Sequence, residues 1–232
     1  MSQVLTLPQG TLSFTDLNNL PLGLVIAGGR KPAINWLTQV GAIFKEVFVA
    51  DKGLDYAKAA GLNPLLVIGD GDSASSDLWQ KAKSETIVKE FPVAKDKTDL
   101  QLLLENLPPD RFYLFSGIWG GRFDHLYSAI HVLIELVRQR QLPLVLADER
   151  ELMILMPPGK QLTFTPPPEE TPLAVSVLPL GGKITCSLSG VRWPLKHAFL
   201  YENDPYAVSN VMNKESMEFI NEDGIAALYI AG

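Results

Sequence analysis

Apolar runs alternate with helix-like segments across residues 22–146, and this alternation is the feature that most constrains the fold. The runs are rich in Val, Ile, Leu and Phe and end close to Gly or Asp, as short buried strands do. They lie at residues 22–27, 46–50, 65–68, 111–115 and 142–146. The segments between them carry apolar residues at helical spacing, at 32–43, 54–60, 96–107 and 124–141. This pattern predicts a mostly parallel sheet with helices on both faces, and ligands beyond the carboxyl ends of its strands.

The composition changes after Glu151. Proline-rich turns at 157–159 and 166–168 interrupt any helix, and the remaining apolar segments are short and β-like. They lie at residues 152–156, 161–165, 173–178, 184–188 and 225–230. We therefore expect an α/β N-terminal domain with a mostly parallel sheet over residues 1–150, and a smaller all-β, sandwich-like C-terminal domain over residues 151–232.

The composition also limits the classes of partner. With 47% hydrophobic and 20% charged residues, the 232-residue chain has the makeup of a globular protein, and its net charge of −6 disfavours nucleic-acid binding through phosphate neutralisation. We expect no signal peptide in residues 1–10 and no membrane span, because polar residues interrupt the most apolar helical stretch, near 126–137. The single cysteine, Cys186, forms no internal disulfide, so we expect a cytoplasmic protein.

An apolar strand runs directly into Gly69-Asp70-Gly71-Asp72-Ser73. Residues two apart on extended backbone point the same way, so Asp70 and Asp72 are expected to face one pocket. Two such carboxylates repel each other unless a divalent cation lies between them, and oxygen ligands of this kind suit Mg²⁺ or Ca²⁺. An Asp/Gly turn that caps the next helix explains this segment, taken alone, equally well.

Further acids follow other predicted strands. Asp51 lies between a strand and a helix, where an Asp is also a common N-cap. Asp96 and Asp99 share one face of the first turn of a predicted helix, which fits a second source of metal ligands and also a variant capping box. Beside Asp70 and Asp72, Asp99 is a credible third carboxylate for a metal site.

Two glycine pairs also lie at strand ends. Residues 28–30, Gly-Gly-Arg, permit close approach to a ligand or form a plain tight turn. Gly120 and Gly121 precede a predicted helix, whose first N–H groups can bind an anion. Arg122 can add a forked contact to a phosphoryl oxygen, and Asp124 is either the N-cap or a residue that orients the ligand. We assign the neighbouring His125 no acid–base role.

Several familiar signatures are missing from the sequence. It contains no Gly-x-x-x-x-Gly-Lys-Ser/Thr loop, no Gly-x-Gly-x-x-Gly after the first strand and no Gly-x-Ser-x-Gly elbow. A nucleotide would therefore be held by glycines, an arginine and a carboxylate-bound metal.

Taken in order, the motifs resemble those of the thiamine pyrophosphokinase family. They are Asp51 with Gly53, Gly69-Asp70-Gly71-Asp72-Ser73, residues 96–99, Gly120-Gly121-Arg122-Phe123-Asp124-His125 and Val208-Ser209-Asn210. The resemblance spans most of the chain. It implies transfer of a diphosphate group from ATP to the hydroxyethyl oxygen of thiamine, giving thiamine diphosphate and AMP, with Mg²⁺ and in a homodimer.

The resemblance also implies roles for individual residues. Asp70, Asp72 and Asp99 match the catalytic acids that bind metal and phosphate, and the proton acceptor is left open between Asp72 and Asp99. The ATP site would comprise Asp51, Asp96, Gly120, Gly121, Arg122 and Asp124. One departure is that Lys52 and Leu54 follow Asp51, where the family usually has small residues.

For thiamine, the resemblance implies a site built partly from the C-terminal domain and across the dimer. Ser209 and Asn210 match the late motif linked to thiamine. Trp193 lies where the family often has an aromatic such as tyrosine, and a plain core or interface position is the alternative.

Three other functions fit the same residues. A related diphosphokinase for another alcohol, such as a hydroxymethyl-pterin, would keep the acids and alter the C-terminal pocket. A non-catalytic sensor of a nucleotide or thiamine diphosphate would bind without turnover. A structural domain whose acids are only helix caps would show no saturable binding of magnesium and ATP.

Overall fold

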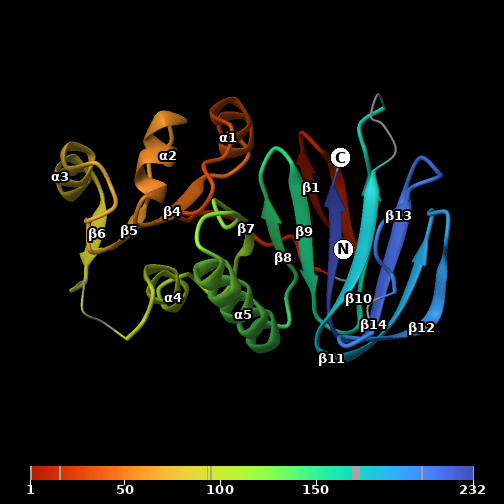
Figure 1. Ribbon diagram of the computed structural model, residues 1–232. Helices are drawn as coiled ribbons and strands as arrows, with labels where there is room; N and C mark the ends of the chain where they lie inside the picture. The colour runs from red at the N-terminus through yellow and green to blue at the C-terminus, as the bar shows by residue number, and fades with distance from the viewer. Residues whose placement is uncertain are drawn as a thin grey trace. The chain divides into compact units, whose positions relative to one another are not determined.

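The computed structural model describes residues 2–15, 17–92, 94, 96–168, 173–204 and 206–231. The chain divides into two compact units, one comprising Pro21–Leu136 and the other Met1–Leu20 with Val137–Gly232 (Figure 1). Among the described residues, no helix combines the length and apolarity that a membrane span requires.

The Pro21–Leu136 unit is an α/β unit. Its sheet has the strand order β7-β3-β4-β5-β6, and neighbouring strands are parallel. These strands are β3 (Leu22–Ile26), β4 (Glu46–Ala50), β5 (Leu66–Gly69), β6 (Ile87–Glu90) and β7 (Phe112–Ser116). The helices are α1 (Ile34–Gly41), α2 (Gly53–Ala59), α3 (Ser76–Glu85), α4 (Asp99–Glu105) and α5 (Phe123–Arg140), whose last residues belong to the other unit.

The core of this unit lies between the central strands and the helices on either side of them. In Figure 1, α1, α2 and α3 lie on one side of the sheet and α4 and α5 on the other. The central strands are almost wholly buried, since they carry continuous apolar runs such as those of β3 and β7. Because the strands are parallel, the loops after β3, β4, β5 and β7 all leave the same edge of the sheet, as expected.

The other unit is built from antiparallel strands. Its main sheet has the order β1-β2-β10-β14-β9-β8, and β11 pairs with β12, β13 and β14. The strands are β1 (Ser2–Leu7), β2 (Gly10–Thr15), β8 (Leu144–Ala147), β9 (Glu151–Met156), β10 (Lys160–Thr165), β11 (Ala174–Ser189), β12 (Leu195–Tyr201), β13 (Asn210–Val211) and β14 (Met217–Ala231). Strand β11 joins two segments that were predicted separately, 173–178 and 184–188, and β14 extends the segment predicted at 225–230 toward its N-terminal side.

The expectation of a mostly parallel sheet is wrong, because strand pairing is mixed. Residues 1–150 include the antiparallel hairpin β1–β2 and also β8, which pairs antiparallel with β9. The hairpin pairs in turn with β10, so the compact units differ from the predicted division at residue 150. The sequence carries the signal of an antiparallel strand with one buried face in β2, where the buried Leu12 and Phe14 alternate with polar residues; β1 departs from it, because Gln3 is buried and Val4 is exposed.

Candidate functional site

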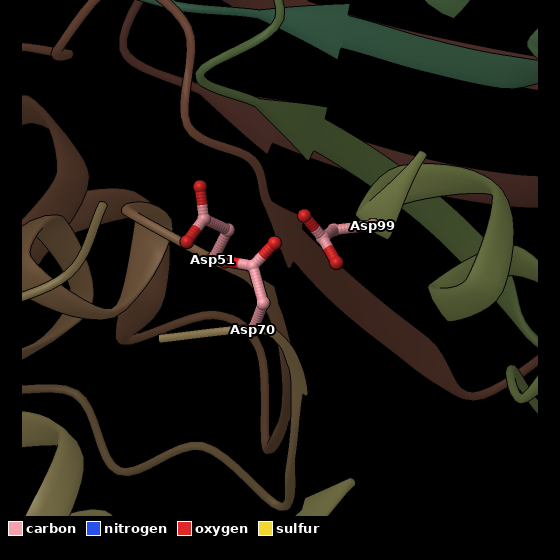
Figure 2. Close-up of side chains that lie close together, drawn as sticks. All are labelled: Asp51, Asp70 and Asp99. Atoms are coloured by element: carbon pink, nitrogen blue, oxygen red, sulfur yellow. The ribbon is translucent and has the colours of Figure 1, made fainter. Parts of the chain in front are cut away.

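Three carboxylates converge at the carboxyl edge of the parallel strands. Asp51 follows β4, Asp70 follows β5 and Asp99 is the first residue of α4. One carboxylate oxygen of each residue lies within 4.8 Å of those of the other two. Figure 2 shows that the three side chains come together from separate segments of the chain. Acidic side chains at this distance are the kind of group that binds a divalent cation.

The strand pairing brings Asp51 and Asp70 together. Beyond the last residues of β4, the N–H of Asp51 still donates to the carbonyl oxygen of Ile68 at 2.8 Å. Asp51 then adopts a left-handed backbone conformation, with φ of 48°, which is uncommon for a residue with a side chain. A side chain at Gly69 would lie 3.2 Å from the Asp51 Cα atom, so glycine permits the close approach of the two strand ends.

A capping box directs the start of α4. The Thr98 hydroxyl accepts a hydrogen bond from the Gln101 N–H at 3.3 Å, and the Gln101 side chain accepts one from the Thr98 N–H at 2.8 Å. Thr98 is therefore the N-cap, and the alternative that Asp96 and Asp99 form the cap does not hold. Asp99 contributes its carboxylate to the acidic cluster instead.

The surroundings of Asp51 favour a cation. Burial raises the pKa of its carboxyl above the ordinary value, and the charges of Asp99 and Asp70 act in the same direction, while hydrogen bonds from the Lys52 backbone and Ser73 oppose it. Its Oδ1 atom is buried and has no hydrogen-bond partner among the described residues. An oxygen of this kind is costly to bury unless something compensates it, and three converging carboxylates fit a hard divalent cation such as Mg²⁺.

Asp72 lies outside this cluster. Its side chain is exposed and accepts a hydrogen bond from the Ser73 hydroxyl at 2.9 Å, while its N–H donates to Asp70 Oδ1 at 3.2 Å. The expectation that it shares a pocket with Asp70 assumed extended backbone, but Gly71 has a φ of 76° and turns the chain. A side chain at Gly71 would lie 2.7 Å from the Trp79 indole, so glycine is what fits between this turn and the ring. Asp51 occupies the position that we expected Asp72 to take.

A cleft of about 450 Å³ adjoins the acidic cluster. Nine of the residues singled out in the sequence line it: Gly28, Gly29, Asp51, Asp96, Asp99, Gly120, Gly121, Arg122 and His125. Asp70, Asp72 and Asp124 do not line it. The lining also includes Lys97 and Thr98, which belong to the 96–99 motif but had been given no role, and Leu126, Ser128 and Ala129, which had not been singled out. The sequence does carry a signal for Thr98, because Thr98 and Gln101 form the Thr-x-x-Gln pattern of a capping box.

Glycines shape the walls of the cleft. The Gly29 N–H donates to the Gly117 carbonyl oxygen at 2.7 Å, and a side chain at Gly29 would lie 2.5 Å from that oxygen. Gly120 and Gly121 have φ values of 67° and 71°, a region that favours glycine. These loops bring backbone groups close to the cleft, where a ligand can approach them.

Arg122 and Asp124 form a forked ion pair at the start of α5. Arg122 Nε and Nη2 lie 3.1 and 2.5 Å from the two carboxylate oxygens of Asp124. The pair lowers the pKa of Asp124 and raises that of Arg122. Both side chains are exposed, so the pair contributes little to stability. Asp124 is the second residue of the helix, not its N-cap.

The residues expected near thiamine lie in the other unit. The Trp193 side chain is 56% exposed, and an exposed Ser209 with φ of 58° precedes Asn210. Asn210 is buried, and its side-chain amide makes hydrogen bonds with the Trp193 backbone, 3.1 Å to the N–H and 2.7 Å to the carbonyl oxygen. Its amide therefore orders the Trp193 loop, while the indole and Ser209 are accessible to a ligand.

Residues 43–146 match the family model described as thiamin pyrophosphokinase, catalytic domain. This range contains the acidic cluster and much of the cleft lining. The comparison with curated proteins found no match.

The structure is similar to a thiamine pyrophosphokinase from Bacillus subtilis, with 25% identity, a TM-score of 0.74 and coverage of 90% of this chain and 98% of that chain. A thiamin pyrophosphokinase family protein from Enterococcus faecalis is also 25% identical, with a TM-score of 0.73 and coverage of 91% and 99%. The thiamin pyrophosphokinase from Candida albicans shares the fold, with a TM-score of 0.74 at 14% identity over 100% of this chain and 99% of that chain. The resemblance that the motifs indicated is confirmed.

Proposed function

We propose that this chain, whose residues 43–146 match the model of the thiamin pyrophosphokinase catalytic domain, transfers a diphosphate group from ATP to the hydroxyethyl oxygen of thiamine. The products would be thiamine diphosphate and AMP. The observation that carries this proposal is the convergence of Asp51, Asp70 and Asp99 beside a glycine-walled cleft. Such a site suits a metal-bound polyphosphate, whose charge must be neutralised before an alcohol can attack it.

Asp51, Asp70 and Asp99 are the residues that would hold Mg²⁺. When bound, the ion would offset the negative charge of the polyphosphate and the mutual repulsion of the carboxylates. Asp72 is exposed and is not one of the three converging carboxylates, so we propose that it acts on substrate rather than as a metal ligand.

The remaining groups of the cleft would position ATP. Backbone groups of residues 117–121 and the start of α5 are suited to phosphoryl oxygens. Arg122 binds Asp124, and we propose that its guanidinium contacts phosphate when ATP is present. In the reaction, the alcohol oxygen bonds to the β-phosphorus, the bond from that phosphorus to the AMP oxygen breaks, and a carboxylate takes the alcohol proton.

The proposal also covers the thiamine contacts, the oligomeric state and the cellular location of the protein. Trp193 and Ser209 are accessible and would contact thiamine, with Asn210 holding the Trp193 loop. An exposed indole suits a flat cationic ring such as thiazolium. The family resemblance supports a cytoplasmic homodimer.

The direct test is to incubate the protein with ATP, Mg²⁺ and thiamine and to identify the products by phosphorus NMR. We expect thiamine diphosphate together with AMP. Formation of ADP would contradict diphosphoryl transfer, and binding of ATP without any product would support a sensor. A hydroxymethyl-pterin tested under the same conditions separates the two diphosphokinase activities.

The matched variants for this assay are Asp51→Asn and Asp77→Asn. Asp51 belongs to the acidic cluster, whereas Asp77 is an exposed acid in the first turn of α3 and is not part of it. We expect the first variant to lose product formation and the second to keep it. Full activity of Asp51→Asn would contradict the metal assignment.

A further inference from the structure

A strained histidine lies in β12, four residues after Trp193. His197 has a left-handed backbone conformation, with φ of 47°, which costs free energy in any residue with a side chain. The cause is a β-bulge. Cys186 of β11 pairs with Ala198 and Leu188 pairs with Leu195, so Lys196 and His197 together lie opposite Ser187.

Hydrogen bonds across three strands hold this bulge. The His197 N–H donates to the Ser187 hydroxyl oxygen at 3.0 Å, and that hydroxyl donates to Glu222 Oε1 at 2.7 Å. The His197 Nδ1 atom lies 2.8 Å from Glu222 Oε2. His197 is thus tied by both its backbone and its ring to β11 and β14. The same two groups lower the pKa of Glu222 below its ordinary value.

The bulge lies directly after the Trp193 loop, at the start of β12. On its N-terminal side the loop is attached to the β13 segment, since Asn210 bonds the Trp193 backbone and the Arg192 N–H donates to the Val211 carbonyl oxygen. On its C-terminal side Pro194 has no N–H to donate, and the chain enters β12 at Leu195. A β-bulge fixes the register of its strand, and loss of the extra residue would shift Leu195 by one position and turn the loop with it.

We infer that His197, acting with Ser187 and Glu222, is a positioning residue that presents the Trp193 indole for thiamine binding. This inference rests on the proposed function. His197 is not placed in contact with substrate; it acts through the loop. Uncommon backbone geometry at a position whose side chain bonds a neighbouring strand, as Nδ1 of His197 bonds Glu222, is found where a structure holds a nearby site.

The test compares two substitutions at one position. His197→Gly relieves the backbone strain but removes the ring, and His197→Asn tolerates the left-handed conformation and keeps a side chain able to bond Glu222. We expect His197→Gly to raise the KM for thiamine by about two- to tenfold, through loss of preorganisation, with kcat and the KM for ATP unchanged. His197→Asn should lie close to the wild type.

The control is Glu202→Gln. The Glu202 carboxylate accepts a hydrogen bond from the Gly182 N–H beyond the other end of β12, so replacing its charge by a neutral amide weakens a contact of the same strand pair without touching the bulge. We expect no change in the KM for thiamine. Equal KM values for His197→Gly and the wild type, or equal increases for His197→Gly and Glu202→Gln, would overturn the inference.

A second readout does not depend on activity. Trp36, Trp79 and Trp119 are buried, at 5%, 3% and 6% exposure, whereas Trp193 is 56% exposed, so acrylamide quenching reports mainly on Trp193. The variant Trp193→Phe gives the background signal of the buried tryptophans. We expect acrylamide to quench the fluorescence of His197→Gly more strongly than that of the wild type, and that of His197→Asn to the same extent as the wild type. Unchanged quenching would overturn the positioning role. A wild type without thiamine activity would instead contradict the proposed function.

Discussion

Asp51 shows at the scale of a single residue how a site can be formed at the expense of stability. Its carboxyl is partly buried, has a raised pKa and lies beside the charges of Asp70 and Asp99. The folded chain therefore bears repulsion here that only a bound cation or the loss of a charge relieves. The sequence marked Asp51 as an acid after a strand, but its partners became known only from the paired strand ends.

Replacing Asp51 by Asn should stabilise the metal-free chain. We expect the thermal midpoint to rise by about 2–4 °C, the shift that about 1 kcal/mol produces in a chain of this size. Mg²⁺ should raise the midpoint of the wild type and leave that of Asp51→Asn unchanged, and EDTA should reverse the wild-type increase. Thermal melts of both chains, with Asp77→Asn as the control, measure this. A lower metal-free midpoint for Asp51→Asn would contradict the repulsion.

Glu222 should make a pH-dependent contribution to stability. Hydrogen bonds from His197 and Ser187 lower its pKa in the folded chain below the ordinary 4.5. A carboxyl with a depressed folded pKa contributes stability above its unfolded pKa, and this is lost as pH falls through the folded pKa. The difference in unfolding free energy between the wild type and Glu222→Gln should therefore shrink as pH falls from above 4.5 through the lowered pKa of Glu222. Urea titrations across that range measure it, and a constant difference would contradict the assignment.

At the scale of elements, the helix starts decide which acids reach the site. The predicted strands and helices between residues 22 and 146 are largely present, with ends shifted by a few residues. α3 and β6 were not predicted, because β6 is largely exposed and α3 buries little apolar surface.

At α4 the capping box belongs to Thr98 and Gln101, which leaves Asp99 to the acidic cluster.

Removing the α4 cap should affect both stability and metal binding. We expect Thr98→Ala to lower the unfolding free energy by about 1 kcal/mol, as loss of an N-cap hydroxyl does. Because Asp99 lies in the same turn, the Mg²⁺ concentration needed for half-maximal binding should also rise. Ser75→Ala is the matched control, since Ser75 occupies the N-cap of α3 without a side-chain capping bond. Equal effects of the two substitutions in urea unfolding and Mg²⁺ titration would rule out a special role for the α4 cap.

At the scale of the whole molecule, the N-terminal hairpin belongs to the antiparallel unit. β2 pairs with β10, and the side chains of Leu5, Leu12 and Phe14 are buried. The hairpin is therefore part of a core formed with strands from the distant end of the sequence. A division of the chain at residue 150 would separate partners that fold together.

Truncating a buried side chain of the hairpin should show how much the stability of the antiparallel unit depends on the hairpin. We expect Phe14→Ala to lower the unfolding free energy of the antiparallel unit by about 3–5 kcal/mol, the usual cost of removing a buried aromatic ring. Val4→Ala, at a side chain that is 49% exposed in the paired strand, should cost less than about 1 kcal/mol. Urea unfolding followed by circular dichroism compares the two. A small effect of Phe14→Ala would show that the hairpin is dispensable to the core.

The sequence by itself determined the alternating α/β pattern, the motifs that indicated the family and nine of the residues that line the cleft. Local patterns determine these features, because periodicity, glycine placement and motif order do not depend on distant contacts. Only the tertiary structure decided that Asp51 replaces Asp72 in the acidic cluster, that Asn210 supports the Trp193 loop and that the N-terminal hairpin joins β10. The physical reason is that each depends on a turn with positive φ or on a pairing between segments far apart in the chain, and neither follows from the periodicity of a single segment.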